Sequence, residues 1–190
     1  MTSASMPSPP PPEIPSPSSQ DAVDDHFMDH ALRLARRAAR RGEVPVGAVA
    51  VWAGEVVGAA GNRIERSADA TAHAEMLALR QASSRMGSWR LHGVTLYVTL
   101  EPCPMCAGAL VLARVDRLVY GAADPKKGAV HSVCRLLDHP ALNHHPQIAA
   151  GVRAGAAAAL LHSFFRARRH PRRAGDNRSA GPILERCPSG

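Results

Sequence analysis

Two short motifs, about thirty residues apart, constrain the fold of this chain more than any other part of its sequence. They are His73-Ala-Glu75 and Pro102-Cys-Pro-Met-Cys106. Cys103 and Cys106 are three positions apart in what the sequence indicates is the first turn of a helix, so both sulfurs face the same side. Pro104 suits that turn, because an N–H at this position would have no helical partner. We therefore expect two helix starts to lie side by side, with the side chains of both motifs converging.

The side chains of His73, Cys103 and Cys106 form a ligand set that is typical of zinc. The positive end of a helix dipole would stabilise the two thiolates. Three protein ligands leave the fourth tetrahedral position open for a water molecule, whose pKa the metal lowers to about 7. Glu75 lies two residues from His73 and is placed to move protons between this water and a leaving group. The sequence therefore predicts a catalytic zinc site.

A structural zinc site is the main alternative, because such a site is closed by a fourth Cys or His. A Cys-x-x-Cys pair alone most often belongs to a structural zinc or redox motif, and only its combination with His-x-Glu favours catalysis. Residues that could close a structural site are Cys134, His131, His139, His144 and His145. Otherwise we expect Cys134 and Cys187 to have no part in the metal site.

Hydrophobic periodicity indicates an α/β fold. The helices are expected at residues 26–41, 71–84, 104–113 and 154–169, and the strands at residues 46–52, 55–58, 94–99 and 117–120. Residues 126–150 are rich in His and Pro and are expected to be irregular. This order predicts a mixed central sheet with helices on both faces, within one domain over residues 26–170.

The two ends of the 190-residue chain differ in composition from its middle. Residues 1–25 hold a Pro/Ser-rich tract with acidic charges only, so we expect a disordered extension. Residues 171–190 are expected to form a basic, disordered tail. The longest apolar stretch, 156–161, is too short to span a bilayer, and no secretory signal is visible. We therefore expect a cytoplasmic protein with no membrane partner. The closely spaced pair Cys103 and Cys106 agrees with this, because it points to a metal site in a reducing compartment more than to a disulfide.

The charge of the chain is strongly positive and unevenly placed. There are 23 Lys and Arg residues against 16 Asp and Glu, a net charge of +7, and seven arginines lie within residues 164–190. Such an excess favours a polyanionic partner, because each neutralised phosphate releases a condensed counterion. Basic tails are also often merely solubilising, so charge alone favours nucleic acid only weakly.

The combination H-x-E and P-C-x-x-C is the known signature of zinc-dependent nucleobase deaminases. Over about residues 26–170, the chain resembles the bacterial tRNA-specific adenosine deaminases. The motifs that carry the resemblance are residues 43–48, 61–63, 71–75, 96–103, 121–124 and 164–166. The resemblance implies a cytidine-deaminase-like three-layer α/β/α sandwich, a homodimer and one Zn²⁺ per subunit. It also implies conversion of adenosine to inosine at wobble position 34 of the tRNA anticodon, in an arginine tRNA. Gly61 and Ala70 depart from the family pattern, which leaves fine specificity open.

The resemblance further implies residues that contact the tRNA anticodon stem-loop at its target nucleoside. Asn62 would hydrogen-bond the nucleoside, while Pro45 and Val46 would line the base pocket. Glu101 and Asp124 would lie beside the substrate loop. Asn62 could equally cap a turn, and an Asp before Pro is a common turn residue.

Lys126, Phe165 and Arg168 would contact or stack on the rest of the anticodon loop. For Phe164 and Phe165 the alternative is core packing of the last helix, and the nearby arginines could simply form a solvated face.

Two other functions would use some of the same residues. A deaminase of a free base or nucleoside, such as guanine or cytosine, needs the same zinc site but has no use for a cluster of positive charge. A catalytically silent RNA-binding or zinc-stabilised scaffold module would have no need of Glu75 as a proton shuttle.

Overall fold

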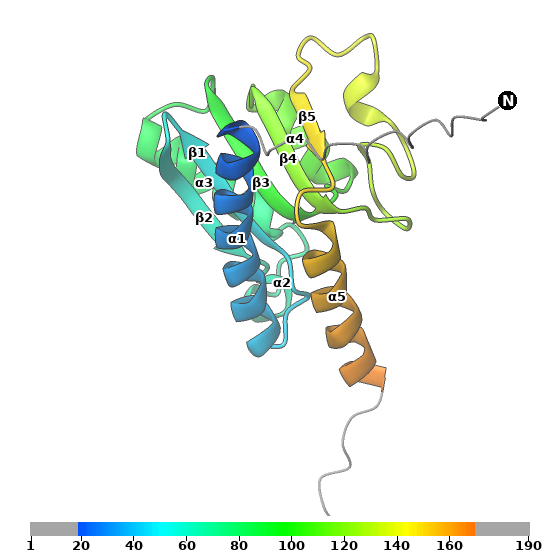
Figure 1. The fold of residues 1–190 in the computed structure, drawn as a ribbon. Coiled ribbons are helices and arrows are strands. Elements are labelled where there is room, and N and C mark those ends of the chain that lie inside the picture. The colour runs from blue at the N-terminus through cyan, green and yellow to red at the C-terminus, as the bar shows by residue number, and fades with distance from the viewer. Residues whose placement is uncertain (1–18, 170–190) are drawn as a thin grey trace, which may run out of the picture.

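The computed structural model describes residues 19–169, which fold into one layered α/β unit (Figure 1). Its elements are α1 (Ser19–Arg40), β1 (Gly47–Trp52), β2 (Glu55–Gly61), α2 (Ile64–Ser67), α3 (Ala74–Met86), β3 (Val94–Leu100), α4 (Pro104–Leu112), β4 (Arg117–Ala122), η1 (Leu136–Asp138), β5 (Gln147–Ala150) and α5 (Ala154–Arg169). The expected tail at 171–190, with Cys187, and most of the expected extension lie outside the described residues. Within residues 19–169, no helix has the length and apolar character needed to cross a membrane.

The sheet is mixed, as predicted, with the strand order β2-β1-β3-β4-β5. Strand β1 is antiparallel to both β2 and β3, whereas β3, β4 and β5 run parallel to one another. Ala53 and Gly54 join β1 to β2 and both have positive φ, as a type I′ hairpin turn requires. Because β3 and β4 are parallel, their carboxyl ends meet at the same edge of the sheet, and the loops that leave them are neighbours.

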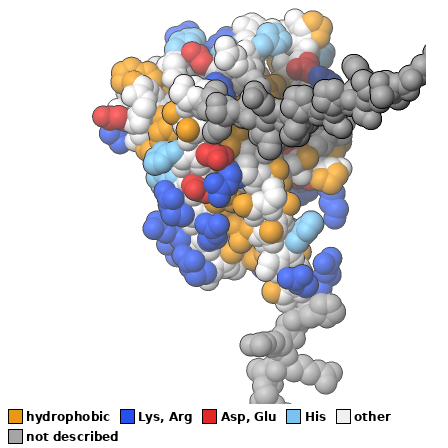
Figure 2. Space-filling view, in the orientation of Figure 1, with side chains coloured by type: hydrophobic (Ala, Val, Ile, Leu, Met, Phe, Trp, Pro, Cys, Tyr) orange, Lys and Arg blue, Asp and Glu red, His pale blue; other side chains and the backbone are white. Residues whose placement is uncertain are grey.

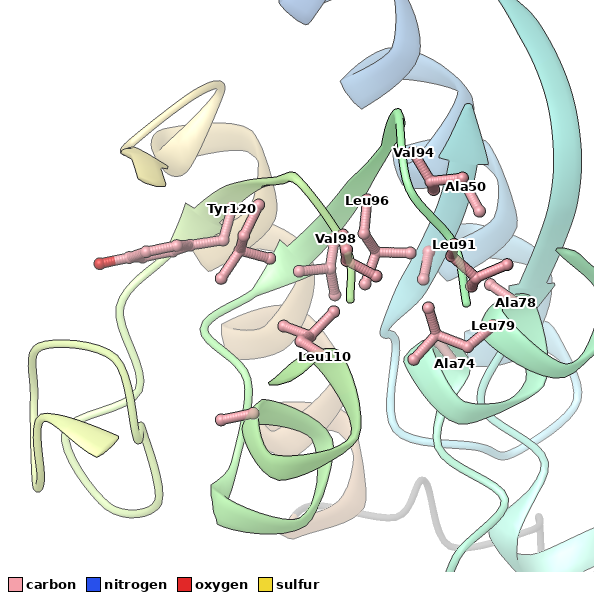
Figure 3. Close-up of a cluster of buried hydrophobic side chains, with 14 of the residues drawn as sticks. Ala50, Ala74, Ala78, Leu79, Leu91, Val94, Leu96, Val98, Leu110 and Tyr120 are labelled. Carbon is pink, nitrogen blue, oxygen red and sulfur yellow. The ribbon is translucent and has the colours of Figure 1, made fainter. Parts of the chain in front are cut away.

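Helices cover both faces of the sheet, which confirms the α/β/α sandwich (Figure 1). Alternate residues of β3 face opposite layers. Leu96 and Val98 pack with α3 and α4 (Figure 3), whereas Tyr97 packs with α1 on the other face. Gly47 and Gly58 let these helices approach closely. A Cβ on Gly47 would lie 2.1 Å from a carbonyl oxygen of α1, and a Cβ on Gly58 would lie 2.2 Å from one of α3.

Helix α1 begins at Ser19, so the expected helix start at residue 26 is wrong. The reason is Asp24, which sequence composition assigned to the disordered extension. Its side chain is buried and accepts two hydrogen bonds from Arg117, both at 2.7 Å, and one from the hydroxyl of Tyr97 at 3.0 Å. The first turns of α1 are therefore held to β3 and β4 through a buried carboxylate.

Three short elements were not predicted. Strand β5 lies within the segment expected to be irregular, and it pairs in parallel with β4 at the edge of the sheet. Its four residues are only partly buried and include a single β-branched residue, Ile148, so neither periodicity nor propensity marks it. The helices α2 and η1 span four and three residues, too few to show a helical period.

Candidate active site and metal centre

Helices α3 and α4 begin at neighbouring points, and each begins at a predicted metal ligand. His73 is the N-cap residue of α3, and Cys103 is the N-cap residue of α4. Pro104 occupies the first turn of α4, and Cys106 follows on the same side of that turn. The local sequence thus places a ligand at each positive helix end, as expected from the spacing.

The three predicted ligands form one compact cluster. Nδ1 of His73 lies 3.7 Å from Sγ of Cys103 and 3.5 Å from Sγ of Cys106, and all three ligand atoms lie within 4.8 Å of one another. The hydrogen bond from Cys106, together with that to His73, lowers the pKa of Cys103 to about 4. The hydrogen bond to Cys103, followed by burial, raises the pKa of Cys106. The Cys103 sulfur is thus biased toward the thiolate, the form in which cysteine binds a metal ion.

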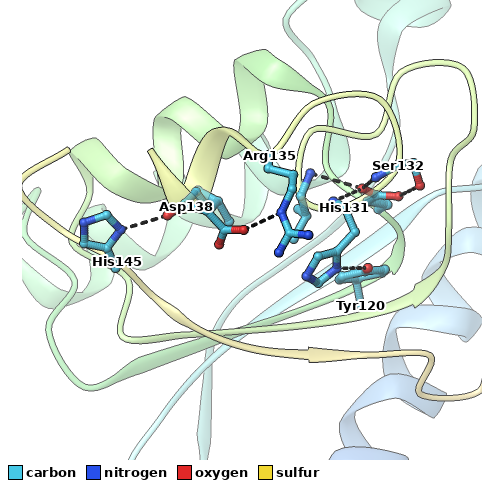
Figure 4. Close-up of polar contacts among 9 residues, drawn as sticks. Tyr120, His131, Ser132, Arg135, Asp138 and His145 are labelled. Atoms are coloured by element: carbon cyan, nitrogen blue, oxygen red, sulfur yellow. Dashed lines mark hydrogen bonds and ion pairs between the residues drawn. The ribbon is translucent and has the colours of Figure 1, made fainter. Parts of the chain in front are cut away.

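None of the residues that could have closed a structural site joins this cluster within the described part of the chain. Nδ1 of His131 contacts the hydroxyl of Tyr120 at 2.7 Å, and His145 contacts the carbonyl of Leu137 at 2.8 Å (Figure 4). His144 contacts the carbonyl of Val115, His139 accepts a hydrogen bond from the backbone N–H of Ala141, and Cys134 is exposed. Among the described residues, the cluster thus contains three protein ligands, which is the number found in catalytic zinc sites.

Glu75 lies in the first turn of α3 and is 4% exposed. Its Oε2 is the one buried side-chain oxygen or nitrogen among the described residues without a hydrogen-bond partner. Burial raises the pKa of this carboxyl, and the nearby His73 opposes that shift. A buried carboxylate oxygen with a vacant acceptor position, beside one imidazole and two thiols, fits a zinc ion with a water molecule in its open position.

The structure brings Asn62, Pro45 and Val46 to the start of α3. The side-chain Oδ1 of Asn62 accepts a hydrogen bond from the N–H of Ala74 at 2.9 Å, and its own N–H donates to the carbonyl of Val46 at 3.0 Å. Asn62 and Val46 are buried, and so is Pro45. Asn62 thus satisfies a backbone N–H in the first turn of α3, next to His73, and its contact with a nucleoside stays a prediction.

Glu101 anchors the loop that follows β4. Its carboxylate accepts hydrogen bonds from the backbone N–H groups of Asp124 (3.0 Å), Val130 (3.1 Å), His131 (2.7 Å) and Ser132 (2.9 Å), and from the hydroxyl of Ser132 (Figure 4). Burial alone would raise the pKa of Glu101, but these hydrogen bonds outweigh it and lower the pKa to about 2. In the same loop, the backbone N–H of Ala129 donates to the carbonyl of Pro102 at 2.8 Å, and Pro102 directly precedes Cys103.

We expect Glu101→Gln to loosen this loop. A glutamine keeps one acceptor oxygen but turns an NH₂ group toward backbone N–H donors, which then lose their partner. The free energy of unfolding should fall by about 2–4 kcal/mol, because several buried donors are left unsatisfied. Thermal unfolding measures the loss, and hydrogen exchange at residues 128–132 locates it. Glu65→Gln, on exposed α2, is the control, and equal exchange rates in both variants would contradict this role for Glu101.

The remaining predicted residues lie on the surface around this loop and α5. Oδ1 of Asp124 accepts from the N–H of Lys126 at 2.9 Å, which is the turn role, and Lys126 itself is exposed. Phe165 is 43% exposed, so it does not pack in the core. Arg168 donates to the carbonyl of Gly42 at 3.2 Å and lies over the ring of Phe164.

Sequence analysis missed the role of Glu43. This residue is buried, and its two carboxylate oxygens accept from the N–H groups of Glu65 (3.2 Å) and Arg66 (2.9 Å) at the start of α2. It thereby fixes the segment that follows Asn62. Glu43 stands at the head of the motif over residues 43–48. The backbone N–H groups that its carboxylate binds lie more than twenty residues away, so no local sequence signal marks this role.

Comparison with known proteins agrees with this fold and site. The family of MafB19-like deaminases matches residues 23–169. The fold and the cluster beside Glu75 thus define a deaminase domain. A tRNA-specific adenosine deaminase of Bacillus subtilis (strain 168) is 45% identical over 151 residues, which cover 80% of this chain and 94% of that protein. The chain belongs to the family of bacterial tRNA-specific adenosine deaminases.

Two solved structures illustrate the range of related chains. One comes from biochemical and structural studies of A-to-I editing by tRNA:A34 deaminases at the wobble position of transfer RNA. It is 48% identical, has a TM-score of 0.70, and covers 72% of this chain and 99% of its own. A guanine deaminase from Bacillus subtilis is 32% identical, with a TM-score of 0.52, and covers 65% of this chain and 82% of its own.

Proposed function

We propose that this protein hydrolyses the adenosine at wobble position 34 of a tRNA anticodon, in an arginine tRNA, to inosine and ammonia. The observation that carries the proposal is the cluster of His73, Cys103 and Cys106 beside Glu75, whose buried Oε2 has no hydrogen-bond partner. The 45–48% identity to a tRNA-specific adenosine deaminase and to a chain from studies of tRNA:A34 deaminases supports the substrate.

His73, Cys103 and Cys106 would hold one Zn²⁺ per subunit. When bound, zinc acts as a Lewis acid that lowers the pKa of a coordinated water to about 7. Glu75 accepts a proton from the attacking water and delivers it to N1 of the adenine ring. It then takes the second proton of that water from the new hydroxyl group at C6 and passes it to the amine at C6, which leaves as ammonia. One C–O bond forms, one C–N bond breaks, and the products are inosine and ammonia.

The residues around the cluster would hold the target base outside its stack. A base must leave its stack to expose C6, and an anticodon loop makes this inexpensive because its bases are already unpaired. Asn62 would hydrogen-bond the nucleoside, with Pro45 and Val46 against the base. Asp124, on the loop that Glu101 anchors, and Lys126, Phe165 and Arg168 would contact the rest of the loop.

We propose a cytoplasmic homodimer as the active form. Exposed apolar side chains support a second copy as partner: Leu112, in the last turn of α4, is 74% exposed, and Trp89, after α3, is 57% exposed. Burial of such side chains is favourable in an interface. Sedimentation at micromolar concentration tests this, and a monomer would remove any role for a neighbouring subunit.

Incubation with an anticodon stem-loop of arginine tRNA tests the substrate. The RNA carries adenosine at the wobble position, and nuclease digestion with mass spectrometry detects inosine. Free adenosine, guanine and cytidine are assayed in parallel. Inosine in the RNA alone is the expected result, whereas ammonia from a free base alone would keep the hydrolytic chemistry and overturn the substrate.

The metal is tested separately. We expect about one zinc per chain by elemental analysis, and at least a tenfold loss of zinc content in Cys106→Ala, because one of three ligands is removed. Cys134→Ala is the matched control, since Cys134 is exposed and outside the cluster. Equal zinc content in both variants would place the metal elsewhere.

A further inference from the structure

A groove runs around the outer edge of the sheet, between α1, β2 and α3. It consists of two adjoining hollows of about 220 and 440 Å³, which share Arg63, Leu77 and Gln81 as lining residues. The first hollow is also lined by Arg37 of α1 and by Arg41, which directly follows that helix. The second continues past Arg63 along α3 to Arg80, Asp69 and Ser84. The edge strand itself is covered here, because Gln81 accepts from the N–H of Ala59 at 3.0 Å.

The positive charge of this groove is hardly compensated. Within residues 19–169, Arg37, Arg41 and Arg63 form no ion pair. Asp69 is the only carboxylate that lines either hollow, and it faces Arg80. Figure 2 shows Lys and Arg side chains gathered over the lower part of α1.

This arrangement has an energetic cost for the folded chain. Arg37 lies in the last turn of α1 and Arg41 directly follows that helix, and both line the first hollow, where their like charges repel. The pKa of His30 is lowered, first by burial and then by the charges of Arg33 and Arg37. Arginines without an ion-pair partner on a concave surface suit a phosphate ligand, because each guanidinium group can bind two oxygens of one phosphate.

Asn62 connects the groove to the proposed active site. It lines the first hollow, and its Oδ1 accepts from the N–H of Ala74, the residue after His73. The residues of the metal cluster themselves do not line either hollow, so the groove lies beside the site and is separated from it by Asn62. Two connected hollows with arginines along both suit a chain of phosphates better than one isolated phosphate.

We propose that the groove defined by Arg37, Arg41, Arg63 and Arg80 binds the phosphodiester backbone of the RNA substrate outside the loop that carries the target adenosine. This subsite rests on the proposed function and extends it. The groove lies on the α1 and α3 side of Asn62, and Arg168 of α5 lies close to its α1 end, because it donates to the carbonyl of Gly42, the residue after Arg41. Lys126 belongs to the loop after β4. The RNA would thus be held by the groove together with Arg168, and by the loop after β4.

The test compares two double variants at the carboxyl end of α1. Arg37→Gln with Arg41→Gln removes two charges that line the groove, and Arg36→Gln with Arg40→Gln removes two charges at the same spacing that do not. Kd for the zinc-loaded protein and the anticodon stem-loop is measured between about 50 and 200 mM salt by fluorescence anisotropy. Circular dichroism confirms that all variants fold, and kcat is measured at saturating RNA.

We expect the groove variant to bind the stem-loop about tenfold more weakly, and its slope of log K against log salt to fall by about 1–2, as for one or two lost phosphate contacts. The matched variant should change Kd less than threefold, and kcat should be unchanged in both. A seven-nucleotide RNA loop without the stem should bind the two double variants with the same Kd.

An equal loss of RNA affinity in the two double variants would overturn the groove as a specific subsite, because only the total positive charge of this surface would then matter. Competition by polyglutamate as strong as competition by RNA would overturn the RNA assignment in favour of an acidic protein partner. If the wild-type protein bound the RNA without forming inosine, the proposed function would fail, while the Kd comparison would still decide the groove.

Discussion

Replacing Glu75 with glutamine should lower kcat on the stem-loop by about a thousandfold, because general acid–base catalysis contributes about 10²–10⁴-fold and the amide cannot carry the proton. Glutamine has nearly the same shape, and Glu75 has an unpartnered Oε2, so no hydrogen bond to the protein is lost at that atom. Zinc content and the midpoint of thermal unfolding should therefore stay close to those of the parent. Turnover is measured as inosine formed under single-turnover conditions.

Glu55→Gln is the control for this variant, since Glu55 begins β2 on the exposed hairpin and its side chain is 75% exposed. A Glu75→Gln variant that deaminated as fast as the parent would show that another group moves the protons. Loss of zinc together with activity would instead show that Glu75 acts on the metal site and would contradict the assigned role.

The second large effect is expected on stability, at Asp24. Asp24→Asn should lower the free energy of unfolding by about 3–5 kcal/mol, because it leaves the partly buried guanidinium of Arg117 without its counter-charge. For a domain of this size, that corresponds to a fall of about 10 °C in Tm. Asp29→Asn is the matched control on α1, since Asp29 forms an exposed ion pair with Arg153 that should contribute less than about 1 kcal/mol.

The effect of Asp24→Asn should also depend on pH. Burial raises the pKa of Asp24, but hydrogen bonds from Arg117, Gln20 and Tyr97, with the charge of Arg117, outweigh burial and lower the pKa below 3.8. The folded pKa is thus lower than the unfolded one, so the stabilisation is complete above about pH 4 and is lost as the pH falls through the folded value. The difference between parent and variant should be constant from pH 5 to 8 and shrink below pH 4. A difference that grew toward low pH would contradict this coupling.

Local signals predicted most of the fold and the metal cluster. The ligand spacing and Pro104 predicted both helix starts, since the positions of His73, Cys103 and Cys106 depend on the geometry of single turns. Short apolar and β-branched runs bounded by turn residues predicted β1 to β4 and their order along the chain. The parts that sequence reasoning missed depend on contacts between distant residues. Asp24 is buried only because Arg117, 93 residues later, neutralises it.

The surface residues show the same division. Nothing local distinguishes Arg37 and Arg41, which line the groove, from Arg36 and Arg40, which do not, until the edge strand and α3 are placed against α1. Likewise, the family resemblance implied that Glu101 lies beside the substrate loop. Its hydrogen bonds with backbone N–H groups became visible only when the loop after β4 was placed against it.

The way Glu101 holds this loop has a consequence for how the enzyme can diversify. Four of its five hydrogen bonds are to backbone N–H groups, which every residue except proline supplies. Among the loop positions, Gly128 alone has no room for a side chain, since a Cβ there would lie 2.4 Å from the carboxylate. Ala129 and Val130 are buried in the core, whereas Lys126 and Lys127 are exposed, and a change of these two lysines would leave all of these hydrogen bonds in place. Contacts with the substrate can thus change at the exposed loop positions while the backbone that lies against Pro102, next to Cys103, stays as it is.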